Sequence, residues 1–134
     1  MTSPVETIDG QSSAEAAAKQ MAATRIEHLV VIDGGGHVVG VISDRDLRAA
    51  QPSLLLVKDP EMRKKALAVM RVTDLMAEDP HIVRPDQPVK DVLRAMLRQH
   101  IGCVPVVDGE GVPVGITTAG DVTKLALSML DRFG

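Results

Sequence analysis

The chain has 134 residues, a formal charge of −3, one cysteine and one aromatic residue, Phe133. This length can bury a core without disulfides, the single Cys103 excludes an intrachain disulfide and fits a reducing compartment, and no apolar run approaches the roughly 20 residues that span a membrane. Acidic and basic residues are interleaved, so the chain lacks the basic block and the aromatic residues that bind nucleic acid, and its opening residues lack the features of a secretory signal. We therefore expect a cytoplasmic protein that binds neither a membrane nor nucleic acid.

The first 50 residues predict a strand, a helix, a hairpin and a second helix. Val5 to Ile8 is a short alternating stretch suited to a strand, and Ser12 and Glu15 then have the spacing of a capping box. The alanine-rich stretch that follows predicts a helix with small side chains on one face. Two β-branched runs joined by a glycine turn predict a hairpin within residues 29–42. After this hairpin the chain enters the second helix.

Residues 51–71 predict a linker that contains one helix. Asp59 before Pro60 combines an N-cap with a proline in the first turn, which is typical of a helix start. This helix is expected to run to Met70. We interpret the segment as a connector rather than as a third domain.

Residues 72–134 repeat the first half at a fixed distance. A shift of 75 residues without a gap aligns identical residues, which are Met21 with Met96, Ile26 with Ile101, Val31 with Val106, Asp33 with Asp108, Gly34 with Gly109, Gly36 with Gly111, Val39 with Val114, Gly40 with Gly115 and Asp46 with Asp121. The second half accordingly predicts a strand at Ile82 and Val83, a helix over 87–99, a hairpin within 104–117 and a last helix to about Asp131. The duplication predicts two similar subdomains that bury apolar faces against each other. They are residues 1–50, which look clipped at their start, and residues 72–134.

Each half ends a strand and begins a helix with the same pattern. The pattern is a glycine, two further residues, a hydroxyl residue, two variable residues and an aspartate, and it spans 40–46 and 115–121. A hydroxyl residue followed three positions later by an acid has the spacing of a capping box, which stabilises any helix start by about 1 kcal/mol. One interpretation therefore gives these residues only a capping role: Ser43, Asp46, Thr118 and Asp121.

The location of the pattern supports a second interpretation, in which it binds a nucleotide. A helix N-terminus beside the end of a strand offers unpaired N–H groups and the positive end of the helix dipole, which favour an anion. The hydroxyls of Ser43 and Thr118 suit a phosphate, and the carboxylates of Asp46 and Asp121 suit the diol of a ribose. The glycine that begins each pattern leaves the room that a planar base or a close backbone approach requires.

The doubled order of elements, the Val-Val/Ile-Asp-Gly hairpins and the Gly…Ser/Thr-x-x-Asp helix starts resemble a tandem pair of cystathionine-β-synthase (CBS) domains, the adenosine-sensing unit called a Bateman module. The resemblance covers essentially the whole chain, and residues 43–47 and 101–108 are most similar to stand-alone bacterial pairs of the acetoin-utilisation type. It implies an α/β fold of two pseudo-symmetric β-α-β-β-α repeats, whose three-stranded sheets pack face to face. It also implies disc-like homodimers and two clefts for AMP, ADP, ATP or a related adenosyl ligand, with no other cofactor.

Carried over by position, the resemblance implies a role for each residue of the pattern. Asp46 and Asp121 would bind ribose hydroxyls, while Ser43 and Thr118 would meet the phosphate or the ribose edge. The base would lie between the first strand of a half and the start of its hairpin, mostly against backbone groups. The residues concerned are Thr7, Ile8 and His28 in one half and Ile82, Val83 and Cys103 in the other.

The halves differ at the variable positions of the pattern, which hold Asp44 and Arg45 in the first half and Ala119 and Gly120 in the second. Arg45 either pairs with a phosphate or is a solvated first-turn residue. We therefore expect the two clefts to bind the nucleotide with unequal affinities.

The function implied by the resemblance is regulatory: a bound nucleotide shifts the packing of halves or protomers, and a partner protein reads the shift. Two rivals remain, a structural dimerisation module without a ligand and an enzyme that acts on a nucleotide.

Other residue types offer weaker candidates for chemistry. The four histidines show no metal-ligand spacing, and neither a nucleophile elbow nor a histidine near in sequence to Ser43 or Thr118 favours catalysis. We therefore predict no metal site and no catalytic residue. Cys103 lies in an apolar run and is expected to pack as a small hydrophobe. The last helix carries an apolar stripe, part of which could remain exposed for a partner.

Overall fold

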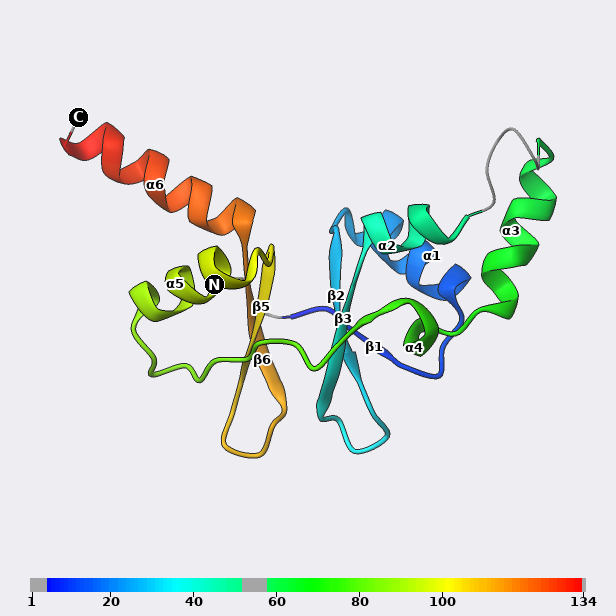
Figure 1. Cartoon of the computed structure of the whole chain (residues 1–134), viewed down its shortest axis with the longest axis horizontal. Coiled ribbons are helices and arrows are strands. Elements are labelled where there is room, and N and C mark those ends of the chain that lie inside the picture. Colours follow the sequence, from blue (N-terminus) through cyan, green and yellow to red (C-terminus); the bar gives the residue numbers. More distant parts are fainter. Residues whose placement is uncertain (1–4, 52–57, 134) are drawn as a thin grey trace. The chain divides into compact units, whose positions relative to one another are not determined.

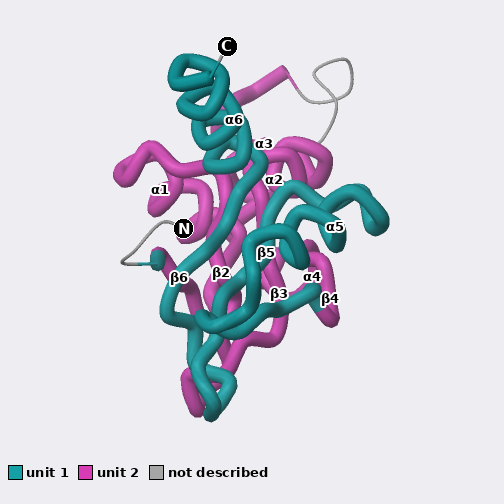
Figure 2. The backbone as a smooth tube through the Cα atoms, turned by 90° about the vertical axis from the view of Figure 1, so that its left-hand side faces the viewer, with its two compact units in different colours: residues 1–5, 80–134 teal, residues 6–79 magenta. Residues whose placement is uncertain are grey.

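A computed structural model describes residues 5–51 and 58–133, which form two compact units. One unit is residues 6–79, and the other combines residues 1–5 with residues 80–134 (Figure 2). The elements in chain order (Figure 1) are β1 (Thr7–Asp9), α1 (Ala14–Thr24), β2 (His28–Ile32), β3 (Val38–Ser43), α2 (Asp44–Ala50), α3 (Pro60–Val69), α4 (Val72–Leu75), β4 (Ala77–Glu78), α5 (Val89–Gln99), β5 (Cys103–Val107), β6 (Pro113–Thr118) and α6 (Ala119–Phe133). The alternation of strands and helices confirms the predicted α/β class.

The unit of residues 6–79 is built on a four-stranded sheet in the order β1-β2-β3-β4. Strand β1 runs parallel to β2, while β3 is antiparallel to both β2 and β4. Helix α1 packs against α2, α3 and α4. The buried core draws on all of these layers and consists of Ile8, Ala14, Ala17, Met21, Leu29, Val31, Ile42, Leu47, Leu67 and Val72.

The prediction of three strands in this unit was wrong, because residues 72–79 pack against the first half and add β4. The backbone N–H of Val72 donates to the carbonyl of Ser12 over 2.9 Å. A Cβ added at Gly40 would lie 2.5 Å from Met76 Sδ and 2.8 Å from the Ala77 carbonyl oxygen. Of the two roles predicted for Gly40, the structure therefore shows the close backbone approach.

The start of α1 differs from the prediction by one residue. Ser13, and not Ser12, is the N-cap, and its side chain accepts a hydrogen bond from the N–H of Ala16 over 3.1 Å. Ser12 belongs to the preceding turn, because its N–H donates to the Asp9 carbonyl and its own carbonyl is taken by α4. The contact with α4 lies far along the chain, so local spacing could not distinguish the two serines.

The unit that contains residues 80–134 is built on the β5–β6 hairpin. The strand predicted at Ile82 and Val83 is reduced to a single bridge, in which Val83 pairs in parallel with Val106. The chain leaves the sheet directly afterwards, since the N–H of Arg84 donates to Gln87 Oε1 and closes a turn. The core cluster of this unit is smaller and consists of Val83, Val92, Val104 and Val106, with Met96, Ile101 and Val114 packed against it.

The two hairpins repeat each other residue for residue at the predicted shift. His28 pairs with Ser43 as Cys103 pairs with Thr118, and both hairpins change register at equivalent positions. Each hairpin turn contains a glycine with positive φ, at Gly36 (84°) and at Gly111 (82°). The duplication is therefore confirmed in the backbone. The division at residues 50 and 71 and the packing of one sheet on the other stay predictions.

Candidate functional site

The hydroxyl residue and the aspartate of each pattern form a reciprocal cap in both units. In the first, the N–H of Ser43 donates to Asp46 Oδ2 over 2.8 Å and the N–H of Asp46 donates to Ser43 Oγ over 3.2 Å. In the second, Thr118 and Asp121 make the same two bonds at 2.9 and 3.2 Å. The predicted capping role is therefore confirmed. It does not exclude binding, because a hydroxyl that accepts an N–H still has its own proton to donate to a phosphate.

Each cap lies beside the first residue of its hairpin. The N–H of Asp44 donates to the Glu27 carbonyl, and that of Ala119 donates to the Gly102 carbonyl, both over 2.9 Å. These bonds tie the start of α2 to the start of β2, and the start of α6 to the start of β5. The structure thus brings together the predicted residues of the hairpin and of the helix start within each unit.

The charge of each aspartate acts on the pKa of the first residue of its hairpin, so the two residues lie close together. Burial lowers the pKa of His28, and the negative charges of Glu27 and Asp46 oppose this shift. Burial raises the pKa of Cys103 to about 12, and the charge of Asp121 adds to the rise. Cys103 is therefore a protonated, buried thiol, in agreement with the packing role predicted for it.

Thr7, Ile8 and Val83 pair with the first strand of each hairpin, β2 or β5. They lie on the side of that strand that faces away from β3 or β6. Thr7 pairs with Val30 and Ile8 with Val31 on β2, just as Val83 pairs with Val106 on β5. The side chains of Ile8 and Val83 are buried in the two cores, while that of Ile82 is 42% exposed. The buried side chains of Ile8 and Val83 cannot reach a ligand, so these two residues can contact a ligand only through their backbone groups.

The variable positions of the pattern differ in charge as the sequence predicts. Asp44 forms an ion pair with Arg48 over 3.2 Å, one turn further along α2. Arg45 lies exposed on the same helix. The second unit has the uncharged Ala119 and Gly120 at these positions. Arg45 is thus open to solvent, and its pairing with a phosphate stays a prediction.

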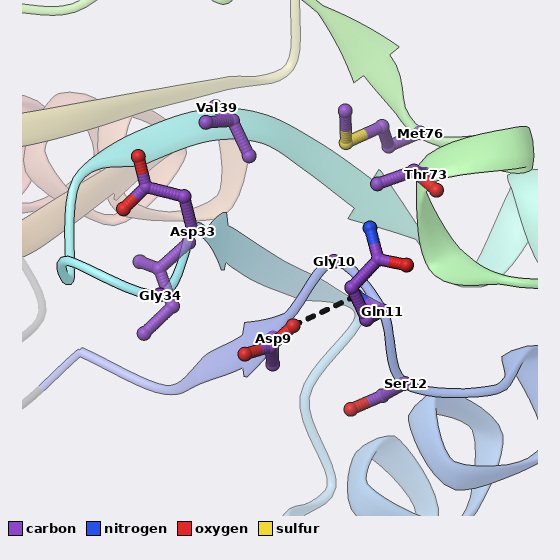
Figure 3. Close-up of a pocket in the computed structure, with 10 residues that line it drawn as sticks. Asp9, Gly10, Gln11, Ser12, Asp33, Gly34, Val39, Thr73 and Met76 are labelled. Carbon is purple, nitrogen blue, oxygen red and sulfur yellow. Dashed lines mark hydrogen bonds between the residues drawn. The ribbon is translucent and has the colours of Figure 1, made fainter.

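A cavity of about 670 Å³ lies at the opposite end of the first hairpin (Figure 3). It is lined by Asp9, Gly10, Gln11, Ser12, Ile32, Asp33, Gly34, Val39, Thr73 and Met76. These include the last residues of β1 and β2, whereas His28 begins β2 and Ser43 ends β3. None of the predicted site residues lines this cavity. Its walls come mainly from the end of β1 with the turn that follows it and from the β2–β3 hairpin, and Thr73 of α4 and Met76 contribute the rest. The position of Thr73 and Met76 is not revealed by the sequence pattern.

The model of the CBS domain family matches residues 1–53 and 72–128, which include both hairpins and both helix starts. The chain belongs to the CBS domain family. A putative acetoin utilization protein (AcuB) from Vibrio cholerae has a solved structure similar to this CBS pair, with a TM-score of 0.76 and 30% identity, covering 98% of this chain and 89% of that one. This relative agrees with the acetoin-utilisation resemblance noted in the sequence.

Two further CBS structures that resemble this one contain ligands. CBSX2 from Arabidopsis thaliana, solved in complex with AMP, has a TM-score of 0.72 and 30% identity, covering 94% of this chain and 90% of that one. The CBS domain pair of protein MJ0100, in complex with 5′-methylthioadenosine and S-adenosyl-L-methionine, has a TM-score of 0.78 and 26% identity, covering 96% of this chain and 93% of that one. The ligands in both structures contain adenosine.

Within residues 5–51 and 58–133, no helix is both long and apolar enough to cross a lipid bilayer. Over the same part of the chain, histidine, cysteine, aspartate and glutamate side chains do not gather into groups of three or more that could hold a metal ion.

Proposed function

We propose that this CBS pair is a regulatory module that binds AMP, ADP, ATP or a related adenosyl ligand at the two helix starts. The observation that carries the proposal is the repetition of one arrangement in both units, in which a hydroxyl, a carboxylate and a helix N-terminus meet the first residue of a hairpin. Adenosine-containing ligands in two CBS structures that resemble this one support the same assignment.

Each residue of the arrangement has a chemical role in this proposal. The hydroxyls of Ser43 and Thr118 donate to a phosphate that the N-termini of α2 and α6 attract. Asp46 and Asp121 accept hydrogen bonds from the ribose diol. The base lies along β1 in the first unit and along residues 82 and 83 in the second, where it meets backbone groups. Binding becomes a signal only if the ligand has different affinities for two packings of the units or protomers.

Ligand-induced stabilisation tests the proposal. AMP at about 100 times its dissociation constant adds about 2.7 kcal/mol to the free energy of unfolding, which raises the melting temperature by about 10 °C. The double variant Asp46→Ala, Asp121→Ala should lose this rise, while each lost cap costs about 1 kcal/mol of stability.

Asp74→Ala is the matched control for the loss of a cap. The Asp74 carboxylate accepts from the N–H of Arg71 over 3.0 Å at the start of α4, outside the proposed sites. This variant should melt earlier and keep the full response to AMP. If AMP, ADP, ATP and S-adenosylmethionine leave the melting temperature of the unmodified chain unchanged, the module binds none of them and the structural rival is favoured.

We also propose that the module forms homodimers through α6. The apolar stripe of this helix is largely exposed, with exposed fractions of 45% for Leu125, 54% for Met129, 65% for Leu130 and 78% for Phe133. A second α6 that packs antiparallel on this stripe about a two-fold axis covers the stripe on both subunits.

A further inference from the structure

Strand β1 is the outermost strand of its sheet, and no other strand within residues 5–51 and 58–133 pairs with its outer edge. The carbonyl of Glu6 accepts from the N–H of Val30 on β2 over 3.1 Å. Since backbone groups of successive residues in a strand point to opposite sides, the N–H and the carbonyl of Thr7 face away from β2. They form a donor and an acceptor at the edge of the sheet.

The second unit has the same outer edge at Ile82. Val83 uses both backbone groups on β5: its N–H donates to the Pro105 carbonyl over 3.1 Å, and its carbonyl accepts from the N–H of Val107 over 2.9 Å. The backbone groups of the preceding residue, Ile82, therefore point away from β5. Ile82 and Thr7 are equivalent under the 75-residue shift.

A side chain from α1 occupies the edge in the first unit. Gln20 Nε2 donates to the Thr7 carbonyl over 2.9 Å and lies 3.2 Å from Glu6 Oε2. The residue equivalent to Gln20 in the second unit is Ala95 on α5. Alanine has no side-chain donor, so position 95 cannot make the equivalent bond to the Ile82 carbonyl. The two units thus differ at the carbonyl that Thr7 and Ile82 present at this edge.

We propose that Gln20 is a specificity-determining residue that weakens recognition of adenine in the first unit. The inference rests on the proposed function. An adenine presents a 6-amino donor beside the N1 acceptor, which matches a backbone carbonyl and N–H of one residue. In the second unit this amino group meets the carbonyl of Ile82, to which Ala95 offers no competing donor. In the first unit it must displace the amide of Gln20, so the second site binds adenosine ligands more tightly.

Calorimetric titration of single-site proteins tests this inference. The first site is isolated by Asp121→Ala, and in that background Gln20→Ala and Gln20→Met are compared with the unchanged Gln20. Methionine keeps the length of the side chain and removes the donor. Both variants should bind AMP about fivefold more tightly, as expected when a hydrogen bond of typical net strength no longer competes for the carbonyl. IMP has an oxygen in place of the 6-amino group, cannot donate to the Thr7 carbonyl, and should therefore gain no affinity in either variant.

The reciprocal change tests the second unit with the first unit intact. In the Asp46→Ala background, Ala95→Gln should weaken AMP binding about fivefold and should not weaken IMP binding, because the added amide can donate to the 6-oxo group of IMP. AMP affinities equal to those of the single-site parents in all three variants would overturn the inference while leaving the proposed function standing. An unmodified chain that binds no adenosine ligand would overturn both. A change of equal size for AMP and IMP would also overturn the role of Gln20, since it would indicate a general structural effect.

Discussion

Positions 28 and 103 show how one residue changes the character of a repeated site. Both begin a hairpin, and the charge of the neighbouring aspartate acts on both. Burial lowers the pKa of His28, so in the folded unit it takes up a proton only at a more acidic pH than a free histidine does, whereas the pKa of Cys103 is raised to about 12. The first unit therefore has a titratable group beside its proposed phosphate and ribose site, and the second has a neutral thiol.

The lowered pKa of His28 predicts a pH-dependent contribution to stability. Below its ordinary pKa of 6.5, His28 takes up a proton in the unfolded chain but not in the folded unit. Its contribution is complete above that value and is lost as the pH falls toward the folded pKa. The free energy of unfolding of His28→Asn should therefore fall less steeply than that of the unmodified chain. Urea unfolding between about pH 7.5 and 5.5 measures this, and parallel curves would contradict the prediction.

The sequence identified the paired capping residues but missed Gln20. Ser43 and Asp46 lie three positions apart, so their spacing alone indicates a bond between them. The bond from Gln20 to Thr7 spans 13 positions and requires α1 to pack beside the edge of β1. A lone glutamine on a predicted helix gives no signal of such a contact. Residues that act through distant partners could be found only from the packed structure.

At the scale of elements, the fit between β3 and β4 depends on Gly40. The Cβ of Gly40→Ala would lie within 3 Å of Met76 Sδ and of the Ala77 carbonyl oxygen. We expect this variant to lose about 1–3 kcal/mol of stability, as is typical of an overpacked site. Gly34→Ala is the control, because a Cβ there meets nothing within 4 Å. Chemical denaturation of both variants measures the difference, and equal midpoints would contradict the role of Gly40.

The long helices and the hairpins were predictable because their signals are local. The Asp59–Pro60 start of α3 and the glycine turns of both hairpins are visible in a few neighbouring residues. The elements α4 and β4 were missed because they are only 4 and 2 residues long and form against the distant first half. The predicted strand at residues 82 and 83 was overstated, since just Val83 bridges to β5.

At the scale of the whole molecule, duplication gives two units with the same local geometry and different surroundings. Helix α2 has 7 residues and buries Leu47. Helix α6 has 15 residues, none of them buried. The sequence predicted the apolar stripe of α6. It left open whether part of that stripe remains exposed. Exposure of the stripe follows from how little of the chain packs against it, which the sequence does not reveal.

If the chain dimerises through α6, a substitution within this stripe should lower its molecular mass in solution. Met129→Lys places a charge in the middle of the covered face and should weaken the dimer about tenfold or more, because an unpaired charge would be buried. Leu127→Lys adds the same charge outside the stripe, where Leu127 is 59% exposed, and should leave the dimer intact. Light scattering over a dilution series distinguishes the two. A monomeric unmodified chain would contradict the proposal.

The position of β4 also bears on how the chain is synthesised. Residues 77 and 78 complete the sheet of the first unit, although they follow the linker. When only the first 71 residues have emerged from the ribosome, the outer strand of the hairpin therefore lacks its neighbour. A bare strand edge invites pairing with other chains, so the nascent protein is most exposed to aggregation during the short interval before residues 77 and 78 have also emerged. A messenger truncated within the linker would make that vulnerable state permanent.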